Sequence, residues 1–174
     1  MENPNYICGA RTHAYGQGYI GLPVTVEGLP QEISVGEINL QAKSTFHVSL
    51  LCVKYLIRKY GESVEQDLLS LFCEFTRENS VSFVRYTGEF RFAEMMERKS
   101  IIAMCEVSNL ESFFELARRE LRISLQSQPT HVTLYTLQPE LGIGLNTQRD
   151  IDQKTRPILV PDRLTEILGA YNMP

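Results

Sequence analysis

Hydrophobic residues recur every three to four positions in two long segments of the chain, and this spacing predicts two amphipathic helices. The first helix is expected to begin at Ser63 and end near Asn79, and the second to begin at Ser108. Each opening Ser is followed three residues later by Gln66 or Glu111, the pattern of a capping box. The apolar faces are expected to hold Val64, Leu68, Leu71, Phe72 and Phe75 in the first helix, and Leu110, Phe113, Phe114, Ala117 and Leu121 in the second.

Strands are predicted where β-branched and aromatic residues cluster between turns. These segments cover residues 46–53, 81–86, 89–92, 99–107, 130–137 and 157–160. Residues 1–40 are rich in Gly and Pro and are expected to hold several short strands, whereas residues 142–154 are expected to form a polar loop. Short helices are expected over 54–60 and 162–169. Because several predicted strands follow each other closely, the pattern favours an α+β fold with antiparallel sheets over a doubly wound parallel sheet.

The composition is that of an ordinary folded domain. The chain has 174 residues, 43% of them hydrophobic and 22% charged, which suits a single domain of residues 1–174 or two small lobes packed together. With 17 Lys+Arg and 21 Asp+Glu the net charge is −4, so no overall basic field exists to hold long duplex nucleic acid. No apolar run approaches the roughly 20 residues that span a bilayer, and the first ten residues lack the features of a signal peptide. We therefore expect a cytoplasmic protein, without membrane attachment, and a monomer.

The four cysteines carry no metal-site pattern. Cys8, Cys52, Cys73 and Cys105 form no C-x-x-C pair and have none of the zinc-ligand spacings. Cys73 and Cys105 lie among hydrophobic residues. The pattern predicts reduced core cysteines, and neither a metal nor another cofactor is expected.

A repeated tetrapeptide carries the chemistry. His47-Val48-Ser49-Leu50 and His131-Val132-Thr133-Leu134 share the pattern H-V-[ST]-L and lie 84 residues apart, about half of the chain. Side chains alternate between the two faces of a strand, so each His shares a face with its Ser or Thr, and the Val and Leu point to the opposite face. The same alternation predicts Tyr135 on the face of His131 and Thr133. Each half of the chain therefore offers an imidazole beside a hydroxyl.

Two such pairs facing each other suit phosphodiester chemistry without a metal. A neutral histidine accepts a proton from the attacking water or ribose hydroxyl, and a protonated one donates to the leaving oxygen. The hydroxyls of Ser49 and Thr133 would donate to phosphate oxygens and stabilise the transition state. Tyr135 would either stack on a nucleobase or fill the floor of the cleft.

The chain resembles the 2H phosphoesterase superfamily, which includes the RNA 2′,3′-cyclic phosphodiesterases, also called 2′-5′ RNA ligases. That family is defined by two H-x-[ST]-x-hydrophobic motifs, which here are residues 47–51 and 131–135. The resemblance covers residues 44 to about 160. It implies an α+β fold of two pseudo-symmetric lobes of antiparallel sheet with outer helices, and motifs on central strands that line a cleft. It also implies His47 and His131 as the acid–base pair, and Ser49 and Thr133 as phosphate-binding residues. Family members usually have a strand and a helix before the first motif, whereas residues 1–40 contain no convincing helix.

Three other features point to ordinary structure. Gly16 to Gly21 match G-x-G-x-x-G, but a strand-like segment follows instead of a helix, so we expect a turn rather than a dinucleotide site. His13 has no repeated partner and is expected to be structural or at the surface. The basic residues Arg149, Lys154 and Arg156 either grip a second phosphate or belong to a solvated loop.

The sequence thus predicts an enzyme, a cyclic phosphodiesterase acting on a cyclic or 2′,5′/3′,5′ phosphodiester in an RNA 3′ end or a small nucleotide. An alternative is a non-catalytic module that binds nucleotides or RNA ends on the same fold. A third hypothesis is a structural domain in which the repeat records only an ancient duplication.

Overall fold

The computed structural model describes residues 5–172. The strands in this range are β1 (Ala14–Gly16), β2 (Tyr19–Val24), β3 (Glu32–Val35), β4 (Ile38–Ala42), β5 (Phe46–Cys52), β6 (Phe83–Met95), β7 (Arg98–Val107), β8 (His131–Thr136) and β9 (Thr155–Pro157). The helices are α1 (Val53–Tyr60), α2 (Ser63–Glu78), α3 (Leu110–Leu121), α4 (Gln148–Lys154) and α5 (Asp162–Gly169). The fold is α+β with antiparallel strand pairs, as the pattern predicts.

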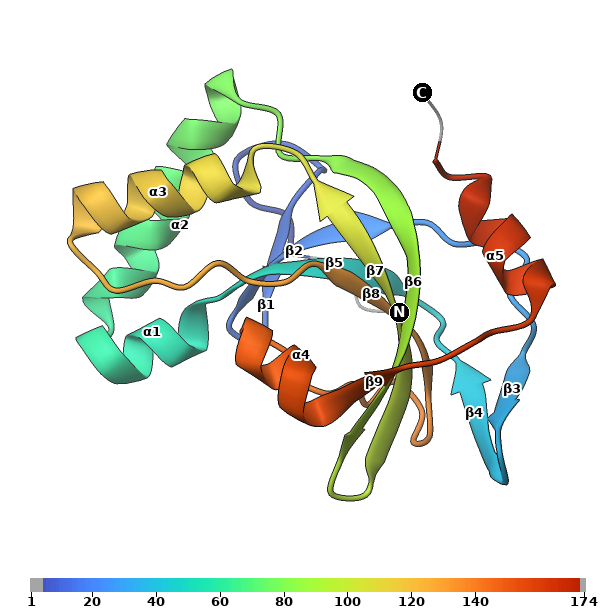
Figure 1. Ribbon diagram of the computed structural model, residues 1–174. Helices are drawn as coiled ribbons and strands as arrows, with labels where there is room; N and C mark the ends of the chain where they lie inside the picture. Colours follow the sequence, from blue (N-terminus) through green and yellow to red (C-terminus); the bar gives the residue numbers. More distant parts are fainter. Residues whose placement is uncertain (1–4, 173–174) are drawn as a thin grey trace.

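The strands join into one sheet with the order β1-β2-β5-β8-β7-β6-β9 (Figure 1). β4 pairs with β3 and also with the end of β8, where Gln41 and Ala42 lie opposite Thr136 and Tyr135. The centre of the sheet is the pair β5 and β8, which are far apart in sequence and meet at Val48 and Val132. The two repeated tetrapeptides therefore lie on neighbouring strands.

The sheet has a main core on one face and a smaller apolar cluster on the other. The main core takes residues from α1, α2, α3 and α5, and includes Val48 and Val132 of the central strands. Figure 1 shows α1, α2 and α3 together on one side of the sheet, with α4 apart from them. The smaller cluster consists of Ala93, Ile102, Ile143, Leu145 and Ile151, the last from α4.

The segment Gly16–Gly21 forms the β1–β2 hairpin, which confirms the predicted turn. Gly16 pairs with Tyr19, and the two residues between them have positive φ, 53° for Gln17 and 79° for Gly18, as a type I′ turn requires. A Cβ at Gly18 would lie 2.6 Å from the Cβ of Lys54. Both the backbone angle and this close approach explain why Gly occupies the position.

Both long helices form as predicted, but neither capping box does. α1 ends at Tyr60, only three residues before α2 begins, and the residue before α2, Glu62, has helical backbone angles. Ser63 therefore lies inside the first turn of α2 and does not cap it. α3 is preceded by Asn109 in the left-handed region, and the hydroxyl of Ser108 donates instead to the carbonyl of Ser80. A capping box is present at α4, where the side chain of Thr147 accepts from the main chain of Asp150.

Two strand predictions need correction. The two strands expected at 81–86 and 89–92 are one long strand, β6, which begins at Phe83 and continues past Gly88 with a register shift against β7. The strand expected at 157–160 lies at Thr155–Pro157 instead. The segment 142–154 is a polar loop only in part, since it contains α4 and the buried side chains of Ile143 and Leu145.

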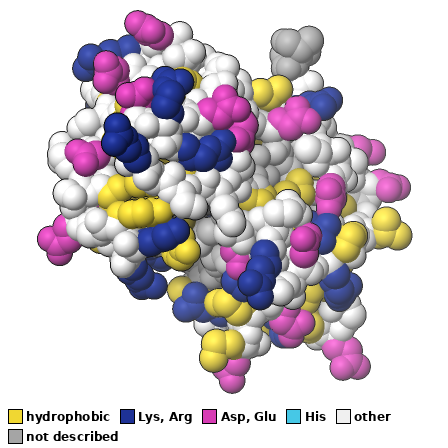
Figure 2. Space-filling view, turned by 60° about the vertical axis from the view of Figure 1, so that its left-hand side comes forward, with side chains coloured by type: hydrophobic (Ala, Val, Ile, Leu, Met, Phe, Trp, Pro, Cys, Tyr) yellow, Lys and Arg dark blue, Asp and Glu magenta, His cyan; other side chains and the backbone are white. Residues whose placement is uncertain are grey.

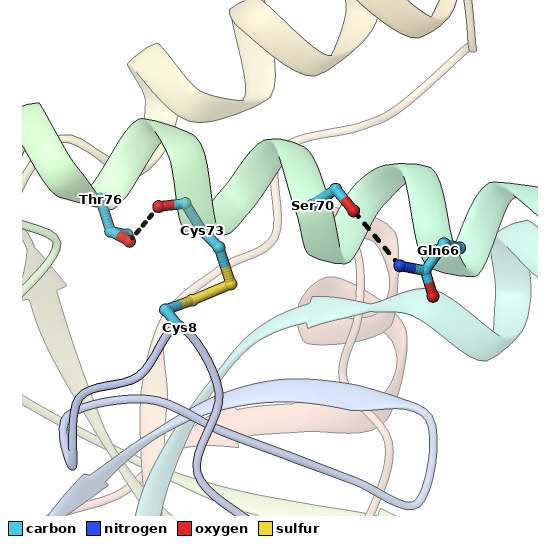
Figure 3. The surroundings of a disulfide bond; sticks show 5 residues. All are labelled: Cys8, Gln66, Ser70, Cys73 and Thr76. Carbon is cyan, nitrogen blue, oxygen red and sulfur yellow. Dashed lines mark hydrogen bonds between the residues drawn. A yellow bond between two sulfur atoms is a disulfide. The ribbon is translucent and has the colours of Figure 1, made fainter.

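The prediction of reduced cysteines is wrong for two of the four. Cys8 and Cys73 form a disulfide that ties the N-terminal segment to α2 (Figure 3). Cys52 and Cys105 are free and buried. Disulfides are characteristic of oxidising compartments, so cysteine usage no longer supports the expected cytoplasmic location. Within residues 5–172, none of the helices has the length and apolar character needed to cross a membrane.

Candidate active site

The pairing of Val48 with Val132 brings the two motifs onto one face of the sheet. Both valines are fully buried in the main core. Because strand side chains alternate, His47 and Ser49 on β5 and His131 and Thr133 on β8 point to the opposite face. In the antiparallel register set by the valine pair, His47 lies opposite Thr133, and Ser49 lies opposite His131. The two histidines are diagonal neighbours, a relationship that places such residues roughly 7–8 Å apart.

Each motif strand has a bulge at the same motif position. On β5, Ser49 and Leu51 pair with consecutive residues of β2, so Leu50 is the extra residue. On β8, Thr133 and Tyr135 pair with consecutive residues of β7, so Leu134 is the extra residue. A bulge interrupts the alternation of faces, and the residue after each bulge therefore turns to the core.

This bulge overturns the predicted role of Tyr135 at the site. Tyr135 has no exposed surface and packs in the main core, on the opposite face from His131 and Thr133. Its hydroxyl has no partner among the described residues, and burial raises its pKa to about 12. Tyr135 therefore cannot stack on a bound base in this structure. Unbroken alternation placed it wrongly because one inserted residue reverses every later face.

His131 is the buried histidine of the pair. Only 6% of its surface is exposed, and its Nδ1 is buried with no hydrogen-bond partner within residues 5–172. Burial lowers its pKa to about 4, the main chain at Pro129 opposes this shift, and His47 adds to it. This effect of His47 on the pKa of His131 is consistent with two imidazoles close together. His131 is therefore neutral at pH 7 in the free protein.

His47 is the accessible histidine. It is solvent-exposed, yet surrounding atoms remove enough hydration to lower its pKa, and the Lys43 ammonium lowers it further. The carboxylate of Glu140 acts in the opposite direction. Glu140 forms an ion pair with Lys43 at 3.1 Å and accepts hydrogen bonds from the main chain and hydroxyl of Ser44. His47 thus lies beside an anchored carboxylate.

The segment 142–146 crosses the site face. A Cβ at Gly142 would lie 3.8 Å from the hydroxyl of Thr133 on β8, and one at Gly144 would lie 3.5 Å from the hydroxyl of Tyr19 on β2. The segment therefore extends from β8 toward β2, over the region that contains His131. Ile143 and Leu145 anchor it in the smaller apolar cluster. The sequence signal for this role was the alternation of two glycines with two aliphatic residues.

Tyr19 is an aromatic residue at the site that sequence analysis missed. It alternates with the buried Ile20 and therefore shares the face of Gly21, the residue opposite Ser49. The Nζ of Lys54 lies 4.6 Å from the centre of its ring, and the amide of Asn146 donates to its hydroxyl at 3.4 Å. Burial is the main cause that raises its pKa to about 12, so the phenol is neutral. Its motif, G-x-G-x-x-G, drew attention to the glycines rather than to the ring.

The three basic residues after the second motif separate in space. Lys154 pairs with Asp150 at 2.5 Å and approaches the carbonyl of Gly144 at 3.4 Å, so it supports the segment over the site. Arg156 lies over the ring of Phe92 on β6, and Arg149 is exposed. Of the three, only Lys154 contacts the segment over the site.

His13 is structural, one of the two alternatives expected from the sequence. It is buried, its Nε2 donates to the carbonyl of Val81 at 2.8 Å, and its ring meets Phe72 edge-on.

Within the described part of the chain, no three His, Cys, Asp or Glu side chains gather in a way that could hold a metal ion. In comparisons with known proteins, no family model, no curated protein and no solved structure matches the chain.

Proposed function

We propose that this protein is a metal-independent phosphodiesterase of the two-histidine type. It would act on a cyclic or 2′,5′/3′,5′ phosphodiester of an RNA end or a small nucleotide. The observation that carries the proposal is the register of β5 and β8, in which the Val48–Val132 pair gathers two imidazoles and two hydroxyls on one face. The bulges at Leu50 and Leu134 add support, because they relate the two motif strands by the same local pattern. They also favour two pseudo-symmetric halves, as in the 2H phosphoesterases.

The pKa values of His47 and His131 indicate which of the two is the acid and which is the base. A base must be neutral and an acid protonated in the same molecule, so the group with the higher pKa serves best as the acid. The pKa of His131 is about 4, whereas His47 is exposed and has Glu140 to favour its charged form. We therefore assign the general base to His131 and the general acid to His47.

The reaction on a 2′,3′-cyclic phosphate follows from these roles. His131 accepts a proton from water as the water oxygen bonds to phosphorus. The bond from phosphorus to one ribose oxygen breaks, and His47 donates its proton to that oxygen. The product is a phosphomonoester with a free ribose hydroxyl. Proton exchange with solvent then restores both histidines.

The two hydroxyls complete the phosphate site. Ser49 faces His131, and Thr133 faces His47, so each imidazole has a hydroxyl across the strand pair. These hydroxyls would donate to the two non-bridging oxygens, where charge develops in the transition state.

Access to the site favours a small substrate or a chain end. The segment 142–146 covers the side of His131, and the exposed side is that of His47. The chain has 17 Lys+Arg against 21 Asp+Glu, and on the one face drawn in Figure 2, where no histidine is visible, basic and acidic side chains are interspersed without a continuous basic stripe. Such a surface offers little to the backbone of a long nucleic acid.

Turnover of nucleoside 2′,3′-cyclic monophosphates and short RNAs with a cyclic end, measured in EDTA, tests the proposal. We expect His47→Ala and His131→Ala each to lower kcat/KM by about 10²–10⁴-fold. Ser49→Ala and Thr133→Val should lower kcat by about 10²-fold. Thr45→Ala, at an exposed position beside the first motif, is the matched control and should keep full activity. Turnover that survives both histidine substitutions would refute the mechanism.

The second candidate function is a module that binds nucleotides or RNA ends without cleaving them. The burial of His131, and the lowered pKa of both histidines, favour this alternative because a neutral pair lacks an acid. Binding of the same ligands that depends on His47 and His131, without turnover between pH 4 and 8, would decide for it.

A further inference from the structure

Gln128 joins the segment before the second motif to the main chain of the first motif. Its Oε1 accepts a hydrogen bond from the main chain of Cys52 at 3.0 Å, and its Nε2 donates to the carbonyl of Ser49 at 3.0 Å. The residue is 6% exposed and lies three positions before His131. One buried amide therefore contacts β5 at two places that enclose the bulge at Leu50.

The strand pairing explains why these two main-chain groups need Gln128. β2 pairs with Ser49 to Cys52 on one side of β5. On the other side, β8 begins at His131 and its pairing with β5 is defined at Val48 and Val132, so β8 does not continue alongside Leu50 to Cys52. A buried carbonyl or N–H without a partner is costly. The side-chain amide offers one donor and one acceptor, as a residue of a neighbouring strand would, and so takes the place of the missing strand.

We propose that Gln128 is a positioning residue of the active site, which holds Ser49 in register opposite His131. This inference rests on the proposed function, since it concerns the same four side chains. Ser49 precedes the extra residue of the bulge, and a bulged strand has freedom to shift unless its ladder groups are fixed. Gln128, which precedes His131 of the second motif, fixes the main-chain groups of Ser49 and Cys52 and thereby positions the hydroxyl of Ser49 in the first motif.

Thr130 provides a matched control in the same segment. Its hydroxyl donates to the carbonyl of Cys105 at 2.6 Å. This is also a partly buried side-chain hydrogen bond to a main chain, but it reaches β7, which carries no motif residue. If Gln128 serves stability alone, Gln128→Met and Thr130→Val should have similar effects on activity.

The experiment compares Gln128→Met, which keeps the length of the side chain, Gln128→Glu, which keeps only the acceptor, and Thr130→Val. We expect Gln128→Met to lower kcat by about 10–100-fold with KM changed less than about threefold, because small misplacements of reacting groups are costly. Gln128→Glu places a second acceptor oxygen against the carbonyl of Ser49 and should lower kcat at least as much as Gln128→Met, and Thr130→Val should stay within about threefold of wild type. Equal kcat for Gln128→Met and Thr130→Val at equal loss of thermal stability would overturn the inference.

A second measurement judges Gln128 without turnover. The ring signals of His13, His47 and His131 and the main-chain amide signal of Ser49 are followed by NMR as inorganic phosphate is added. Gln128→Met should displace the signals of His131 and the Ser49 amide and weaken phosphate binding about tenfold, while His13 stays unchanged. A wild type that neither turns over nor binds phosphate would refute the proposed function, and the displaced signals would then still decide on Gln128. Unchanged signals of Ser49 and His131 in Gln128→Met would refute the positioning role.

Discussion

Val48 and Val132 lie directly opposite each other on β5 and β8, and both are completely buried. This one contact between residues 84 positions apart decides where the four polar side chains of the motifs point. A shift of either strand by one residue would turn its histidine and its hydroxyl into the core. The apolar residues of H-V-[ST]-L are therefore as important to the site as the polar ones.

The pH dependence of kcat/KM is expected to show a maximum on the acid side of neutrality. In the free protein, His131, the proposed base, becomes neutral above about pH 4, and His47, the proposed acid, has a pKa below its ordinary value of 6.5. The active combination is most populated between these limits, and kcat/KM should fall on both sides. The profile of kcat should lie at higher pH, because a bound phosphate favours the charged form of both rings. A maximum of kcat/KM above pH 7.5 would contradict the lowered pKa values of the two histidines.

Stability is expected to decrease as the pH falls below 6.5. The unfolded chain protonates His131 near pH 6.5, whereas the folded chain keeps it neutral down to about pH 4. The unfolded state therefore binds more protons in this window, and the free energy of unfolding drops by roughly 3 kcal/mol between the two limits. Urea unfolding of the wild type and of His131→Gln at pH 7.5 and 4.5 measures the effect. The variant should lose less stability on acidification, although the lowered pKa of buried His13 contributes to both proteins. An equal loss in the two proteins would contradict the buried, neutral state of His131.

The disulfide is expected to stabilise the fold without assisting catalysis. Cys8 and Cys73 are separated by 65 residues, and a crosslink that closes such a loop restricts the unfolded chain by about 4 kcal/mol. We expect this loss in the free energy of unfolding for the double variant Cys8→Ser/Cys73→Ser, measured with urea, and no more than a twofold change in kcat. Wild type in dithiothreitol should match the double variant, and dithiothreitol should leave the double variant unchanged. Stability of the wild type that is insensitive to reductant would contradict the prediction.

Much of the local structure could be predicted from the sequence because it depends on short-range geometry. The strands with the two motifs and the helices from Ser63 and Asp162 lie close to where the pattern places them. The helix ends were less predictable. The box at Ser63 is absent because the preceding helix takes the chain into α2 directly, and this depends on packing rather than on the local sequence.

The residues around the motifs were harder to find, since each reaches the site from a distant part of the chain. Gln128 contacts Ser49 across 79 positions, and Tyr19 and Asn146 are separated by 127. No periodicity links such residues. The pairing of Cys8 with Cys73 has the same origin, because the chain path rather than the spacing brings the sulfur atoms together.

The presentation of an imidazole and a hydroxyl on one face of each motif strand could be predicted from the sequence alone, because alternation is a property of every extended backbone. The apolar faces of the helices could also be predicted. The folded chain was needed to show that β5 and β8 are neighbours, that a bulge turns Tyr135 into the core, and that His131 is buried while His47 stays exposed. These features arise from pairing and packing between distant segments, where the burial of both valines selects one register among those that alternation alone allows.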